Sequence, residues 1–169
     1  MPRPDLSRVP EWYHRYINQV KEDDLMAAFK NQEAEFNRFF GELPGEKRDY
    51  RYAEDKWTIR EVLQHIIDGE RVFAYRSLCI ARKDKTPLPS FDENSYAENS
   101  KAGKREWQDM IEEFQTIRRG NEIMFKSFDA EQLDSTGTAS GKSVYVLGLG
   151  YVLIGHVNHH IGIIRERYL

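Results

Sequence analysis

Three of the five histidines in this 169-residue chain lie close together, in the segment Gly155-His156-Val157-Asn158-His159-His160. On an α-helix with about 100° per residue, His156 and His160 share one face, whereas His159 points about 60° away from His156. Two neutral imidazoles one turn apart can hold a single divalent metal ion. The alternative for such a short pattern is a hydrogen-bonded pair of core or surface histidines without an ion.

The residues around this pair favour an inward position. The helical stripe that contains His156 and His160 is otherwise apolar, and so is the stripe beside it. The apolar members are Leu149, Leu153 and Ile163 in the first stripe and Leu147, Ile154, Val157, Ile161 and Ile164 in the second. Unpaired polar groups in such surroundings are costly, and a metal ion would satisfy both rings.

A third donor must come from another segment, and His65 is a candidate. It flanks the apolar face of a predicted helix, with Glu61 one turn before it and Asp68 one turn after it. Three imidazoles from two helices would make an open site for Zn²⁺, Ni²⁺ or Fe²⁺, with a position left for water or substrate. We expect Glu61 and Asp68 to orient the ring of His65, and His159 to support the site from beside it.

The helix that carries His65 has the clearest start in the sequence. Thr58 and Glu61 have the spacing of a capping box, and Trp57 with Val62 have that of a hydrophobic staple. Apolar residues at three- and four-residue spacing predict four long helices in all. They span about 24–40, 58–82, 104–127 and 143–169.

The segments between these helices predict how the helices are connected. Residues 83–100 are rich in Pro, Ser, Asn and Asp and form a polar connection long enough to return along the molecule, so that the second and third helices run parallel. Asp129 and Gln132 are spaced to cap one extra turn. Residues 135–142 are expected to form a loop, with Ser143 capping the last helix. Only Tyr50–Tyr52 shows a weak strand pattern. The sequence therefore predicts an all-α four-helix bundle in a single domain, 1–169.

Composition excludes several classes of protein. Lys and Arg number 25 and Asp and Glu number 28, a formal charge of −3, so nothing favours nucleic-acid binding. A single cysteine, Cys79, excludes an internal disulfide and a cysteine-rich metal site, and it favours a reducing compartment. The longest apolar run, Val144–Gly155, is too short to span a membrane. We expect a cytoplasmic protein.

Three glycines on the last predicted helix recur every seven residues, at Gly148, Gly155 and Gly162. Glycine costs about 1 kcal/mol in a helix interior, so a line of three predicts a close backbone approach. One candidate for that approach is a second copy of the chain, which would make a homodimer. The other is the N-terminal segment Pro10–Gln19, which would keep the chain monomeric.

Two segments resemble the DinB-like (DinB/YfiT) family. Lys56–Asp68 is similar to its W-[ST]-x-x-E-[VIL]-[LV]-x-H-[LI]-x-[DE] pattern, and Gly155–Gly162 is similar to its H-x-x-x-H helix. The resemblance implies a bundle with up-down-down-up topology and a divalent metal held by His65, His156 and His160. Residues 1–21 lie outside the family motif.

The same resemblance implies a range of activities on small-molecule substrates. Family members include transferases and an isomerase that use a low-molecular-weight thiol cosubstrate, and metal-dependent hydrolases. In either chemistry the metal would act as a Lewis acid, and the nucleophile would be an external water or thiol. The absence of a catalytic cysteine is compatible with both. The alternative from another class is a non-catalytic bundle that binds metal or a partner.

Overall fold

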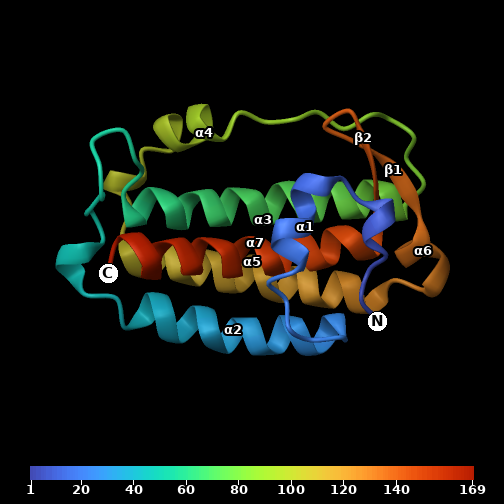
Figure 1. The fold of residues 1–169 in the computed structure, drawn as a ribbon, viewed down its shortest axis with the longest axis horizontal. Helices are drawn as coiled ribbons and strands as arrows, with labels where there is room; N and C mark the ends of the chain where they lie inside the picture. Colours follow the sequence, from blue (N-terminus) through green and yellow to red (C-terminus); the bar gives the residue numbers. More distant parts are fainter.

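The computed structural model describes all residues, 1–169, and its centre is a bundle of four long helices. These are α2 (Leu25–Gly41), α3 (Ile59–Ala81), α5 (Trp107–Ser127) and α7 (Val146–Arg167). Helices α2 and α7 run in one direction and α3 and α5 run in the other (Figure 1). The predicted all-α bundle with up-down-down-up topology is thereby confirmed.

Helix α3 begins where its sequence predicts. The Thr58 hydroxyl accepts a hydrogen bond from the Glu61 N–H at 3.2 Å, and the Glu61 carboxylate accepts one from the Thr58 N–H at 2.7 Å. This capping box satisfies backbone donors that have no partner inside the helix. It fixes the register of α3 and so the direction in which His65 points.

The connection between the parallel helices α3 and α5 runs back along the bundle, as predicted, but it is more structured than expected (Figure 1). It contains α4 (Glu93–Ser100) and the short 3₁₀ helix η3 (Ala102–Lys104), and α5 begins only at Trp107. Asp92 caps α4 by accepting from the N–H groups of Asn94 and Ser95. Only Ala97 of α4 is buried, so this helix has no apolar periodicity that could predict it.

The predicted loop at 135–142 is wrong, because these residues belong to a β-hairpin. Strand β1 (Thr136–Ala139) pairs antiparallel with β2 (Lys142–Tyr145). Ser140 and Gly141 both have positive φ, as a tight hairpin turn requires. Helix α7 follows β2 directly, and its N-cap is Tyr145 rather than Ser143. The strands escaped prediction because each has four residues and little alternation, and the weak pattern at Tyr50–Tyr52 forms no strand.

The remaining elements are short. Asp129 and Gln132 form the predicted capping box of one extra turn. The short elements are η1 (Leu6–Arg8), α1 (Glu11–Ile17), η2 (Gly45–Lys47) and α6 (Ala130–Asp134).

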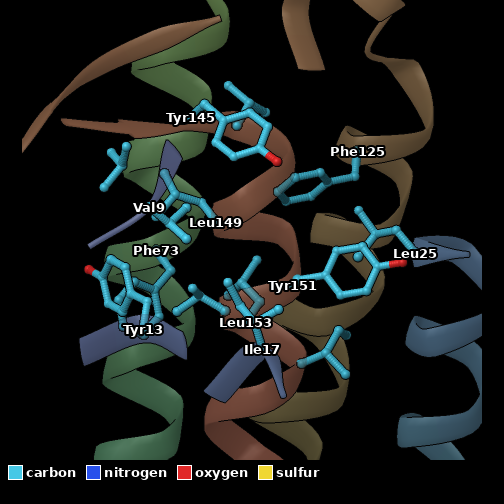
Figure 2. Close-up of a cluster of buried hydrophobic side chains, with 14 of the residues drawn as sticks. Val9, Tyr13, Ile17, Leu25, Phe73, Phe125, Tyr145, Leu149, Tyr151 and Leu153 are labelled. Carbon is cyan, nitrogen blue, oxygen red and sulfur yellow. The ribbon is translucent and has the colours of Figure 1, made fainter. Parts of the chain in front are cut away.

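The N-terminal segment covers the glycine face of α7. Figure 2 shows Tyr13 and Ile17 of α1 reaching toward Phe73 of α3 and Leu153 of α7. A Cβ atom at Gly155 would overlap the carbonyl oxygen of Tyr16, and one at Gly148 would lie 2.5 Å from Val9 Cγ1. Gly162 is open. The glycine face proposed for a homodimer contact is therefore covered at Gly148 and Gly155 by the N-terminal segment of the same chain.

A buried ion pair joins the parallel helices α3 and α5. The guanidinium of Arg118 lies 2.7 Å from the Glu70 carboxylate, and Asn121 donates a 2.7 Å hydrogen bond to the same carboxylate. All three side chains are buried. The charge of Glu70 is thus matched inside the protein.

Helix α7 is the most apolar element. By length and composition it is the one helix that could cross a membrane, and 67% of its most apolar window is buried within the bundle. That burial is typical of the core helix of a folded domain.

Candidate metal centre

Three histidine side chains converge between α3 and α7. His65 comes from α3, and His156 and His160 come from α7. The Nε2 atom of His156 lies 2.9 Å from that of His65 and 3.1 Å from that of His160. His65 is 6% exposed and His156 is 3% exposed, whereas His160 is half-buried. The cluster therefore reaches solvent on the side of His160.

Close packing sets the position of the central ring. A Cβ atom at Gly69, one turn after His65 on α3, would lie 2.8 Å from Cε1 of His156. The missing side chain lets this imidazole approach the α3 backbone. Phe73 and Tyr16 both pack edge-on against it, with ring centroids 5.4 Å away. Trp57, which precedes the cap of α3, lies 4.9 Å from the ring of His65.

The surroundings keep the three rings neutral. Burial lowers the pKa of His65 to about 4, with His159 adding to the shift. Burial is also the main cause that lowers the pKa of His156 and of His160 well below the ordinary histidine value, and neighbouring imidazoles lower both further. A neutral imidazole carries a free lone pair, which is the form that binds metal ions.

The donor set fits a transition-metal ion. Nitrogen ligands about 2.05 Å from one ion lie between about 2.9 Å apart, at neighbouring octahedral positions, and about 3.3 Å apart, in a tetrahedron. The two observed Nε2 separations, 2.9 and 3.1 Å, fall within or at the edge of this range, so the rings are close enough to share one ion. No fourth His, Cys, Asp or Glu joins the cluster. Imidazole donors suit Zn²⁺, Ni²⁺ or Fe²⁺ rather than the oxygen-preferring Mg²⁺ or Ca²⁺.

A family model described as the DinB superfamily matches residues 28–164, which include all three histidines. The chain belongs to the DinB superfamily. Among solved structures, the fold is similar to that of YfiT from Bacillus subtilis, a probable metal-dependent hydrolase with an unusual four-helix bundle topology. The TM-score is 0.73 at 15% sequence identity, over 96% of this chain and 89% of that one. Among curated protein sequences, none matches significantly.

Glu61 and Asp68, the two carboxylates expected to orient the His65 ring in this DinB-superfamily chain, form hydrogen bonds with other residues. The Glu61 carboxylate accepts from the backbone of Thr58 and closes the capping box. Asp68 accepts a 2.9 Å hydrogen bond from Gln64. Neither carboxylate is hydrogen-bonded to His65, because the imidazole crosses toward α7 while both carboxylates remain bonded within α3.

His159 lies beside the cluster and outside the converging set. Its Nδ1 is 3.2 Å from Nε2 of Gln19, which also donates to the carbonyl of Arg15 at 3.2 Å. The Gln19 amide therefore donates to Nδ1, and the His159 proton is on Nε2. Its ring packs against Tyr16 at 5.2 Å and against His160 at 5.2 Å. His159 thus forms part of the outer wall.

The sequence analysis placed neither Tyr16 nor Gly69 beside the histidine cluster, although it considered the N-terminal segment as a cover for the glycine line. Tyr16 lies outside the segment that the DinB model matches, and its only sequence signal is the glycine at 155 that admits it. Gly69 is one member of a helix face that reads as apolar, and nothing in the spacing distinguishes it. Both contacts depend on how two distant helices pack.

Proposed function

We propose that this DinB-superfamily chain is a metal-dependent enzyme that activates an external nucleophile at His65, His156 and His160. The observation that carries the proposal is the convergence of three Nε2 atoms without a fourth protein ligand. Three protein ligands with one open position are typical of catalytic zinc sites, whereas structural sites are closed by four.

The chemistry divides between the ion and the chain. When bound, a divalent metal supplies Lewis-acid chemistry and lowers the pKa of a water molecule or a thiol. The chain holds three neutral imidazoles, keeps two of them away from water and leaves the side of His160 open. Tyr16 packs against both His156 and His159 beside the cluster.

Two reactions fit this arrangement, and both use a small-molecule substrate. In hydrolysis the nucleophile is water, as the description of YfiT would imply for a relative. In transfer it is a low-molecular-weight thiol that attacks an electrophile. The protein would provide no nucleophile of its own in either case, because Cys79 lies outside the cluster. A single cysteine also agrees with a reducing cytoplasm.

Metal analysis tests the ligand assignment. Protein purified without a metal-affinity column should contain about one transition-metal ion per chain. Alanine in place of His65, His156 or His160 should remove that ion. His159→Ala is the matched control, because it deletes a neighbouring imidazole and should retain the metal. Loss of metal in His159→Ala but not in His160→Ala would contradict the assignment.

Cobalt substitution tests whether a coordination position is open. The Co²⁺ protein should change its visible spectrum when 2-mercaptoethanol is added, because the thiolate occupies the free position. A spectrum that does not respond would indicate a closed, structural metal and would favour the non-catalytic alternative. If the spectrum responds, assays of ester and amide substrates with and without added thiols separate hydrolysis from thiol transfer.

A further inference from the structure

A cleft lies between α3 and the connection that returns to α5. Figure 1 shows this connection running along α3. The volume of the cleft is about 300 Å³, at the small end of ligand pockets. The walls are mostly apolar and aromatic: Val72, Tyr75, Leu88, Phe91 and Tyr96. Tyr75 and Tyr96 are half-exposed, and the rings of Phe91 and Tyr96 are 5.1 Å apart.

Arg76 lines this cleft and is only 3% exposed. Its guanidinium donates to the carbonyl of Pro89 at 2.7 Å, to the Ser140 hydroxyl at 3.0 Å and to the Tyr13 hydroxyl at 3.3 Å. All three acceptors are neutral. The Nε–H donates to none of them, and Arg76 takes part in no ion pair.

Arg118, the other deeply buried arginine, has a counter-charge that Arg76 lacks. Arg118 is 2% exposed, and its guanidinium contacts the carboxylate of Glu70. A buried charge without a counter-charge is costly, so buried arginines are ordinarily paired. Arg76 is buried to the same degree and has hydrogen bonds but no anion. Its charge is therefore not matched by a carboxylate of the chain.

We propose that the cleft binds a small aromatic carboxylate, with its carboxylate on Arg76 and its ring between the aromatic walls. Both Nη2 hydrogens of Arg76 are donated to Pro89 and Ser140, whereas its Nε–H and one Nη1–H have no acceptor in the chain and can each donate to a carboxylate oxygen. Tyrosine and phenylalanine faces stack on an aromatic ring. Arg71 lines the rim, but it is half-exposed and already contacts Glu113 at 2.6 Å, so its charge is matched.

This site is distinct from the histidine cluster. Val72 lies two helical turns after His65 on α3, or about 10 Å along the axis. None of the three histidines lines the cleft. Binding at Arg76 therefore stands independently of whether a metal is bound.

Calorimetric titration of EDTA-treated, full-length protein with 1-naphthoate tests the proposal. One naphthoate should bind per chain, and the neutral isostere 1-naphthamide should bind at least about tenfold more weakly. Chelation ensures that the carboxylate is not captured by a metal. Equal affinity for the two compounds, or no binding of naphthoate, would overturn the proposal.

Three variants locate the site. Arg76→Gln should reduce naphthoate affinity to that of the amide and leave amide affinity unchanged. Arg71→Gln, which removes the matched charge at the rim, should leave the preference for naphthoate intact. Tyr96→Ala removes a half-exposed aromatic side chain from the wall that α4 contributes. It should weaken the binding of both compounds several-fold, and it tests the site even if Arg76→Gln does not fold. Unchanged affinity in Tyr96→Ala, or loss of the preference in Arg71→Gln alone, would place the binding elsewhere.

Discussion

Two polar clusters are buried in this bundle, and only one of them brings opposite charges together. In the first, Glu70, Arg118 and Asn121 bind one another across α3 and α5. In the second, His65, His156 and His160 direct three nitrogen atoms at one another, and no carboxylate joins them. The first cluster brings opposite charges together between parallel helices, whereas the second brings together three neutral nitrogen donors. Burial and polarity alone therefore do not distinguish a structural cluster from a candidate functional site in this protein.

The largest effect should follow from breaking the cluster of opposite charges. Arg118→Met leaves the Glu70 carboxylate buried without a counter-charge and should lower the free energy of unfolding by about 3–5 kcal/mol. Denaturant titration followed by circular dichroism measures it. The control is the double variant Glu70→Leu/Arg118→Met, which should recover most of the loss, because Nε and Nη1 of Arg118 have no partner even in the intact pair. A double variant as unstable as the single one would contradict this account.

The histidine cluster should make the metal-free protein sensitive to acid. The pKa of His65 is about 4 in the folded state, below its ordinary value of 6.5. Between these values the unfolded chain binds more protons than the folded one, so stability should fall as pH drops from 6.5 to 4, by roughly 3 kcal/mol for His65 alone.

The difference between the unaltered protein and His65→Gln isolates this contribution, because glutamine does not titrate. Unfolding free energies measured at several pH values should fall more steeply in the unaltered protein. Equal slopes would show that the His65 ring is not held neutral by burial.

The outer wall of the histidine cluster depends on a glycine. Gly155→Ala would push α1 and Tyr16 away from α7 and should cost about 1–3 kcal/mol. Gly162→Ala is the matched control, since it lies one heptad further along the same helix and its Cβ would contact nothing. It should stabilise the protein by up to about 1 kcal/mol. Thermal unfolding of both variants measures the contrast, and equal melting temperatures would contradict it.

The smallest effect is expected at Gly69, where α3 packs against the ring of His156. Gly69→Ala places a methyl group against Cε1 of His156 and should tilt this ring, which lowers metal affinity about tenfold, or about 1.4 kcal/mol. Competition with a chromophoric chelator measures the affinity. Gly120→Ala on α5, where a Cβ meets nothing, should leave it unchanged. An unaltered affinity in Gly69→Ala would mean that the ring position is set by Phe73 and Tyr16 alone.

The sequence predicts the local features of this protein and misses those that arise from packing. The cap at Thr58, the helical face shared by His156 and His160, and the long return of the chain before α5 are all properties of adjacent residues. The hairpin at 136–145, by contrast, is held by tertiary contact, since a Cβ at Gly137 would lie 2.6 Å from Ile80 Cγ1. Likewise Glu70 and Arg118 are ordinary charged residues in the sequence, and only the packing of α3 against α5 makes them a buried pair.

The docking of α1 on α7 has a consequence for how the chain is made. Gln19 and His159 are 140 positions apart, and a ribosome adding roughly 5–20 residues per second needs roughly 7–28 seconds to cover that span. Throughout that time α1 exposes Tyr13, Tyr16 and Ile17 without their partners on α7. His65 is also synthesised long before the other two histidines. The histidine cluster is therefore among the last parts of the nascent chain to assemble.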